Sequence, residues 1–114
     1  MPEIEEKRHV ARSLIQLPVL YRRKAPEPVK AGAGWTHNLS EEGACVEFSE
    51  RLEAPSSVQL LFQTDQGSLD LSAVVIWAAA VRATGHGILH GVTFGDLTPD
   101  QRKGLKELLR AKDR

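Results

Sequence analysis

The sequence has 114 residues, the length of one domain, and 41% of them are hydrophobic, enough to bury one modest core. Its 15 basic and 15 acidic residues cancel to a formal net charge of +0, and aromatic residues make up 5%. This balance argues against a surface for DNA or RNA polymers, which needs basic excess and stacking aromatics. The single cysteine, Cys45, excludes an intrachain disulfide and an all-cysteine metal site.

No secretory signal and no membrane insertion are predicted. Residues 1–12 are charged rather than apolar. The longest apolar run, Ala73 to Val81, is too short to span a bilayer and has the length of a strand. A soluble, cytoplasmic protein is therefore the default expectation.

The chain begins with a polar segment and a first strand. Residues 1–12 are predicted to form a flexible arm, with a marginal helix as the alternative, and its charge is acidic first and basic from Lys7. Residues 13–21 are predicted to form a strand that contains Pro18, which indicates an edge or a bulge. Three cations at 22–24 end that strand, and the Pro- and Gly-rich residues 25–34 read as a loop.

Residues 37–48 combine a polar turn with a half-buried strand. Asn38 and Ser40 carry short side chains that bond backbone groups nearby in the chain. Gly43 lets the backbone turn with a positive φ, or lets a ligand approach where a Cβ would clash. The next residues alternate, with Ala44 on one face and Cys45 on the other. Two polar side chains beside bare backbone suit a planar, hydrogen-bonding ligand, although an ordinary loop has the same pattern.

Further strands are predicted at 58–64, 69–81 and 88–94, with hairpin turns at 65–68 and 83–87. In the long strand the alternation blurs over residues 74–77, which predicts a bulge or burial on both faces.

The C-terminal segment predicts a helix that packs against the sheet, across one barrel opening. Thr98 and Gln101 form a capping box around Pro99 at the first helical position. Several short antiparallel strands followed by one helix predict a mainly β fold. It is a small antiparallel β-barrel of about six strands, or a sandwich, over residues 13–112.

The sequence offers no convincing catalytic or metal-binding constellation. His86 and His90 are four apart, but the glycines around His86 disfavour a helix, and in a strand their backbones lie about 13 Å apart. Ser40 and His37 lack a third member and an oxyanion site. We therefore expect no enzyme activity, no metal and no resident cofactor.

Arg8 and Arg12 lie four apart just before the first strand. A guanidinium is planar, permanently charged and a fork of donors, so it binds a phosphate or the O6/N7 edge of guanine in a bidentate manner. Two of them on one arm would clamp a small anionic guanine ligand. A solvated pair, or one salt-bridged to Glu5 or Glu6, is the alternative.

The combination resembles the PilZ domain, the bacterial receptor family for cyclic di-GMP. Its pattern is Arg-x-x-x-Arg followed by Asp/Asn-x-Ser-x-x-Gly, which matches Arg8/Arg12 and Asn38/Ser40/Gly43. The segments at 91–94 and 98–99 also look like the family's closing strand and helix start. The resemblance covers roughly Lys7 to Leu109.

The resemblance implies a role for each matched residue. Arg8 and Arg12 would bind guanine edges and phosphates, Asn38 and Ser40 would hydrogen-bond a guanine, and Gly43 would let the base lie against the sheet. Asn38 stands where Asp is more frequent, and its single acceptor predicts a weaker bond to a guanine N–H.

Two further residues bear on the ligand. Lys7 precedes the arginine motif, and a basic residue there would favour a stacked pair of ligand molecules over a single one. Trp77 is a candidate for stacking on the ligand, and a tryptophan in the barrel core is the alternative.

These features together predict a cyclic di-GMP receptor. Ligand binding would draw the N-terminal arm onto the barrel, and the ordered arm would signal to a downstream protein. A PilZ-fold adaptor that acts without nucleotide is the alternative. A monomer or weak dimer is expected, and motility, exopolysaccharide, virulence and development are all compatible pathways.

Overall fold

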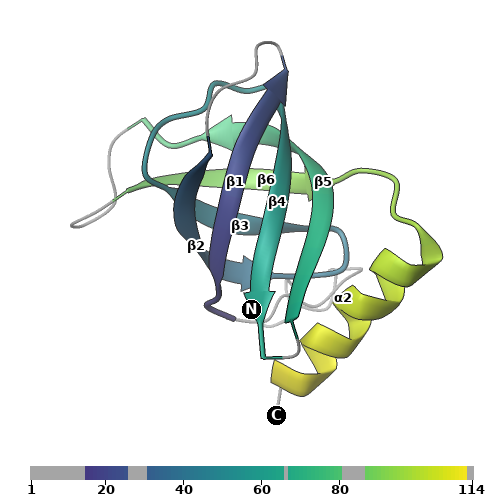
Figure 1. Cartoon of the computed structure of the whole chain (residues 1–114). Coiled ribbons are helices and arrows are strands. Elements are labelled where there is room, and N and C mark those ends of the chain that lie inside the picture. The colour runs from purple at the N-terminus through teal and green to yellow at the C-terminus, as the bar shows by residue number, and fades with distance from the viewer. Residues whose placement is uncertain (1–14, 26–30, 66, 81–86, 113–114) are drawn as a thin grey trace, which may run out of the picture.

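The computed structural model describes residues 15–25, 31–65, 67–80 and 87–112. Its strands close into one antiparallel barrel in the order β1-β2-β3-β6-β5-β4, followed by a helix (Figure 1). The elements are β1 (Pro18–Ala25), β2 (Gly32–Leu39), β3 (Gly43–Phe48), β4 (Ser56–Thr64), β5 (Gly67–Ala78), β6 (Ile88–Phe94) and α2 (Pro99–Lys112). The predicted barrel with a C-terminal helix is confirmed, and the sandwich is excluded.

The first two strands depart most from the predicted bounds. The first strand starts at Pro18 rather than residue 13, and the cations at 22–24 lie within it instead of ending it. Ile15 to Leu17 instead form a lead-in outside the strand. Arginine and lysine are tolerated on the outer face because their aliphatic stems cover the sheet while the charged heads stay in water.

Residues 32–34, predicted as loop, belong to β2. The glycines there are packing residues rather than turn signals. A Cβ on Gly32 would lie 2.6 Å from Cζ of Tyr21, and one on Gly34 would lie 2.1 Å from the carbonyl oxygen of Glu47. Only glycine therefore fits at these two positions.

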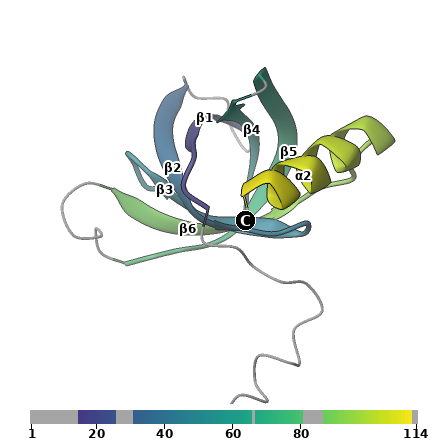
Figure 2. The ribbon, with the colours of Figure 1, turned by 90° about the horizontal axis from the view of Figure 1, so that it is seen from below.

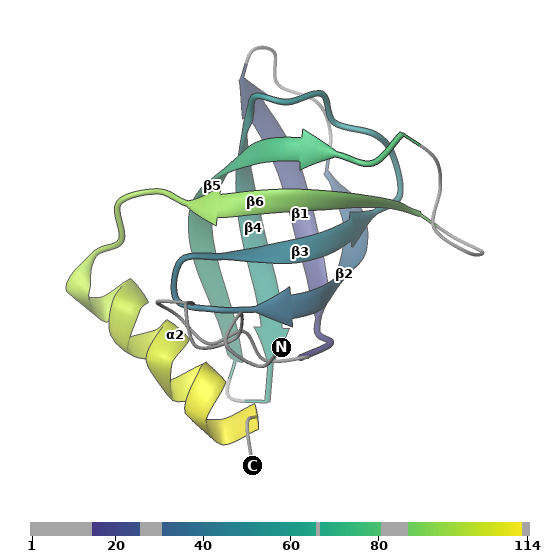
Figure 3. The ribbon, with the colours of Figure 1, turned by 180° about the vertical axis from the view of Figure 1, so that it is seen from behind.

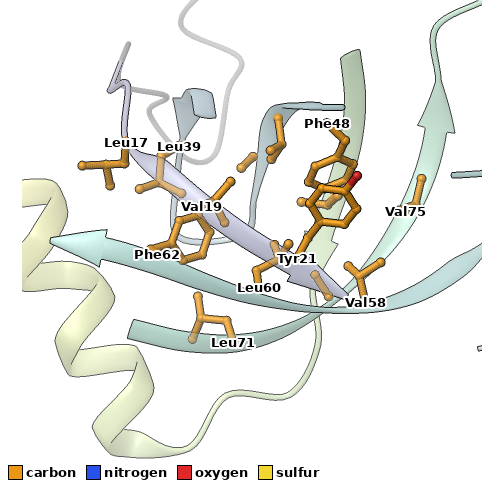
Figure 4. Close-up of a cluster of buried hydrophobic side chains, with 14 of the residues drawn as sticks. Leu17, Val19, Tyr21, Leu39, Phe48, Val58, Leu60, Phe62, Leu71 and Val75 are labelled. Atoms are coloured by element: carbon orange, nitrogen blue, oxygen red, sulfur yellow. The ribbon is translucent and has the colours of Figure 1, made fainter. Parts of the chain in front are cut away.

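Alternate side chains of every strand fill the barrel (Figure 4). The rings of Tyr21 and Phe48 meet at a centroid distance of 4.1 Å, and Tyr21 Oη shares a hydrogen bond of 3.0 Å with Ser49 Oγ. Other buried residues of this cluster are Val19, Leu39, Val46, Val58, Leu60, Phe62, Leu71 and Val75.

Bulges in β5 and β2 change which side chains reach the outer face. The pairing of β5 with β6 shifts between Val75 and Trp77, which confirms the predicted bulge and leaves Ile76 and Trp77 both exposed. β5 ends at Ala78, before the predicted residue 81, and residues 81–86 lie outside the described ranges. The pairing of β2 with β3 shifts between Thr36 and Asn38.

The helix begins with the predicted capping box. The Gln101 N–H donates to Thr98 Oγ1 at 3.1 Å, and the Thr98 N–H donates to Gln101 Oε1 at 2.8 Å. Gln101 Nε2 also donates to the Asp70 carbonyl at 2.9 Å, which ties α2 to β5, and Leu105 and Leu108 join the core. Seen from below, α2 runs beside β5 (Figure 2). No helix in the described ranges has the length and apolar composition that a bilayer crossing requires.

Candidate functional site

The turn between β2 and β3 is closed by the side chain of Ser40. Its hydroxyl donates to the Gly43 carbonyl and accepts from the N–H groups of Glu42 and Gly43, each at 3.2 Å. The Ser40 N–H donates to the same carbonyl at 2.9 Å, and the residue is 1% exposed. The hydroxyl therefore satisfies buried backbone groups, which makes Ser40 the residue that fixes the shape of the turn.

Gly43 lies against β6. A Cβ there would be 2.2 Å from the Val92 carbonyl oxygen, so a glycine is required for the two strands to approach. The turn is held from the same side, because the Glu42 carbonyl accepts from the Phe94 N–H at 2.8 Å and from Thr93 Oγ1 at 3.2 Å. The role of Gly43 toward a ligand stays a prediction.

Asn38 is the first paired residue after the bulge of β2, at which His37 is passed over in the register. Its Oδ1 accepts a hydrogen bond of 3.2 Å from the Cys45 N–H, and its side chain is half-buried. Aspartate could accept the same bond, so this structural role is compatible with either residue. The bond anchors the Asn38 side chain next to Cys45.

Register pairing extends from Asn38 into a row across four strands. Asn38 pairs with Cys45, Cys45 with Gly91, and Gly91 with Trp77. The row crosses the barrel face made by β2, β3, β6 and β5 (Figure 3). The middle of the row carries only a thiol and a hydrogen, and Gly91 is buried, so a low floor is left at Cys45 between the side chains of Asn38 and Trp77.

Trp77 forms one end of this floor and is 44% exposed, which excludes the alternative of a core tryptophan. A Cβ on Gly91 would lie 2.1 Å from Trp77 Nε1, so the indole lies directly over the glycine. Sequence reasoning missed Gly91, since a glycine in a strand shows no partner until the register is known.

A histidine–carboxylate pair borders the row. His37 Nε2 and Glu47 Oε1 are 2.9 Å apart, and their side chains are 38% and 16% exposed. Cys45 and Glu47 are two residues apart in β3, so strand alternation places both side chains on the outward face. Both Cys45 and Glu47 are further candidates for the predicted site.

The predicted arm residues Lys7, Arg8 and Arg12 lie outside the described residues. The described chain starts at Ile15, beside β2. Thr36 Oγ1 donates to the Ile15 carbonyl at 2.5 Å and accepts from the Leu17 N–H at 2.8 Å, while the Thr36 N–H donates to the Leu17 carbonyl at 3.0 Å. The segment that follows the arm is thus hydrogen-bonded to Thr36, two residues before Asn38 in β2.

His90 is buried in the described barrel, and its ring hydrogen-bonds two backbone groups. His90 Nε2 accepts from the Leu52 N–H at 2.9 Å, and Nδ1 donates to the Ile88 carbonyl at 2.8 Å. Burial lowers the pKa of His90. Its predicted spacing partner, His86, lies outside the described ranges, within which no cluster of three metal-ligating side chains occurs.

The fold is similar to solved structures. These are the PilZ domain of CeSA from a cellulose-synthesizing bacterium (TM-score 0.68, 22% identity, 91% of this chain and 99% of that chain) and the Bacillus subtilis inhibitor of motility MotI/DgrA (0.69, 14%, 92% and 50%). Another is the PilZ domain of YcgR from Escherichia coli, determined with c-di-GMP (0.72, 15%, 95% and 92%). With sequence identities this low, the structural similarities establish a shared fold and nothing beyond it.

No curated protein sequence matches the chain closely enough to count as a relative. The family model of the PilZ domain, however, matches residues 6–111, which includes both predicted motifs and the whole barrel. The chain belongs to the PilZ domain family.

Proposed function

We propose that the chain is a cyclic di-GMP receptor that transmits the level of this second messenger to a partner protein. Support comes from its family, from the two motifs, and from the c-di-GMP in the similar YcgR domain. The ligand would lie on the face that carries Asn38, Cys45 and Gly91, with the N-terminal arm closing over it.

Each side of this site has a distinct task. The guanidinium groups of Arg8 and Arg12 supply bidentate donors to phosphates and guanine edges. Asn38, anchored at Cys45, presents its amide to a base, while the Ser40 turn holds that strand end in place. A purine is flat, so it can lie on the low floor and stack against the indole of Trp77.

The attachment of the arm is the observation that carries the proposal. Arg12 is three residues before Ile15, so their Cα atoms lie within about 11 Å however the chain bends. Ile15 is fastened to Thr36, and Asn38 is about 7 Å further along the same strand. The arginine motif and the polar turn are therefore tethered within reach of one small dinucleotide.

The signal would be the ordering of the arm. A ligand held by both the arm and the barrel binds the closed arrangement better than the open one, and so shifts the population toward it. The closed arm then presents a changed surface and charge to a partner.

Calorimetric titration with cyclic di-GMP tests the proposal. We expect binding by the native chain and at least a tenfold weaker affinity in Arg8→Ala and in Arg12→Ala. Arg110→Ala, an exposed arginine of α2, is the matched control and should bind like the native chain. Unchanged binding in both arm variants rejects the proposal, and no binding by the native chain favours the nucleotide-independent adaptor. One ligand per chain would contradict the stacked pair expected from Lys7.

A further inference from the structure

The outer face of β4, β1 and β2 carries an apolar patch formed by Pro18, Leu20, Ala33, Trp35 and Leu61. The members are neighbours by register, because Pro18 pairs with Trp35 while Leu20 pairs with Ala33 on one side and Leu61 on the other. Trp35 is 55% exposed and Leu20 is 44% exposed. Contiguous exposed apolar side chains are a feature of interaction sites on folded domains.

The patch and the nucleotide site lie on opposite sides of the barrel. β1 and β4 face the viewer in Figure 1, whereas β3 and β6 face the viewer from behind in Figure 3. β2 belongs to both, since it carries Trp35 in the patch and Asn38 in the site. One strand therefore connects the two surfaces.

The patch has a cationic end. Beyond Leu20, the outward residues of β1 are Arg22 and Lys24, each about 7 Å further along the strand. Neither makes an ion pair within the described ranges. Two carboxylates on the adjoining strands β5 and β3 are engaged elsewhere, Asp70 by Gln59 Nε2 and Glu47 by His37.

We propose that this patch docks a segment of a partner protein that presents a large apolar side chain beside acidic residues. The apolar side chain would lie between Trp35 and Leu20, and the acidic residues would pair with Arg22 and Lys24. Tryptophan and arginine, here Trp35 within the patch and Arg22 at its end, are among the residue types that contribute most to binding energy at interfaces.

A partner fits the patch better than a second copy of the chain does. A stable dimer interface uses roughly 20–30 residues from each side, and the patch has five members. If the same patch of a second copy docked here, it would bring Arg22 and Lys24 again and no carboxylate to pair with the cations of the first copy. The occupant is therefore a transient partner. This inference rests on the proposed function only in taking that partner to be the receiver of the signal.

Selection of displayed random peptides on the full-length chain, without nucleotide, tests the patch. We expect enriched peptides that combine a large apolar residue with at least two Asp or Glu. In fluorescence anisotropy, an enriched peptide should bind at least tenfold more weakly to Leu20→Ser and several-fold more weakly to Arg22→Ala. The matched controls are Ile76→Ser and Arg110→Ala, which change an exposed apolar residue and an exposed cation outside the patch.

Several outcomes would overturn the inference. Enriched peptides that are basic, or that bind Leu20→Ser as well as the native chain, would remove the patch as their site. Sedimentation showing a dimer that Leu20→Ser dissociates would assign the patch to a second copy. A tenfold gain in peptide affinity in the double variant Glu5→Lys/Glu6→Lys would assign it to the chain's own arm.

The experiments distinguish failure of the docking proposal from failure of the receptor proposal. Peptide docking is measured without nucleotide, and Leu20→Ser and Arg22→Ala are titrated with cyclic di-GMP in parallel. We expect both variants to bind nucleotide like the native chain. Docking without nucleotide binding would leave the patch in place and remove the receptor function, and the reverse result would remove the patch alone.

Discussion

At the scale of single residues, His90 shows how a polar group is accommodated inside the barrel. Leu52 offers only an N–H and Ile88 only a carbonyl oxygen, so the two hydrogen bonds require a neutral ring with its proton on Nδ1. The ring also lies 4.7 Å from that of Phe48. Burial is the largest cause of the lowered pKa of His90, and the charge of Arg51 lowers it further. The hydrogen bond to the Ile88 carbonyl and the charge of Glu53 raise the pKa and offset part of this effect.

The lowered pKa of His90 predicts a loss of stability in acid. Because the folded pKa lies below the unfolded value of about 6.5, the unfolded chain binds more protons as pH falls through that value. The free energy of unfolding should therefore be constant above about pH 7 and fall below 6.5, with a limiting slope of about 1.4 kcal/mol per pH unit. Urea unfolding of the native chain between pH 5 and 7.5 measures it.

The control for this prediction is His90→Gln, which keeps one acceptor and one donor but does not titrate. We expect it to be less stable than the native chain at pH 7.5 and to show a smaller slope below pH 6.5. Equal slopes in the two chains would mean that other groups cause the acid loss.

The residue scale also shows what the sequence could and could not reveal about the site. The polar turn at Asn38, Ser40 and Gly43 was predictable because those residue types bond locally. The partners of the Ser40 hydroxyl are all within three residues of it. Gly91 could not be placed, because its position beside Cys45 depends on the pairing of β3 with β6, two strands far apart in the chain.

At the scale of elements, the contact between β6 and β5 at Gly91 sets the position of Trp77. The prediction concerns Gly91→Ala, whose added methyl must displace the indole that lies over it. We expect Trp77 emission to shift and cyclic di-GMP affinity to fall by tenfold or more. Measuring emission in a Trp35→Phe background isolates Trp77, the other tryptophan of the chain.

Gly95→Ala is the matched control for this change. The nearest atom to a Cβ on Gly95 is the Ser72 carbonyl oxygen at 3.7 Å, an ordinary contact. Its emission and affinity should equal those of the native chain. If Gly91→Ala leaves both quantities unchanged, the indole does not contribute to the floor of the site.

Most elements were predictable because alternation and capping are local signals. The strand at 88–94 and the helix start at Thr98 and Pro99 follow the prediction closely. The predicted start of β2 was wrong for one physical reason. Gly32 and Gly34 were read as turn residues, whereas they make room for Tyr21 and for the β3 backbone.

At the scale of the whole molecule, the hydrophobic core cluster of the described residues runs from Ile15 to Leu108. Because this cluster begins at Ile15, we predict that deleting residues 1–12 leaves the barrel folded while removing Arg8 and Arg12, the proposed ligand contacts. We expect a melting temperature within a few degrees of the native value and a loss of cyclic di-GMP affinity of a hundredfold or more. Circular dichroism and calorimetry on the same sample measure the two quantities.

A matched full-length variant, Arg8→Ala/Arg12→Ala, separates the arginines from the rest of the arm. Equal losses of affinity in both chains would assign the effect of the deletion to the two side chains. An unfolded deletion chain would show instead that residues 1–12 contribute to the barrel.

The pairing of β1 with β4 closes the barrel, so each described strand has a neighbour on both sides over at least part of its length. A free edge is the usual template on which another chain adds a strand, in recognition as in aggregation. Where the described ladders are continuous, the barrel offers no such template, and a partner that docks there would recognise side chains. The specificity of that docking would then depend on residues that substitution can change while the backbone stays the same.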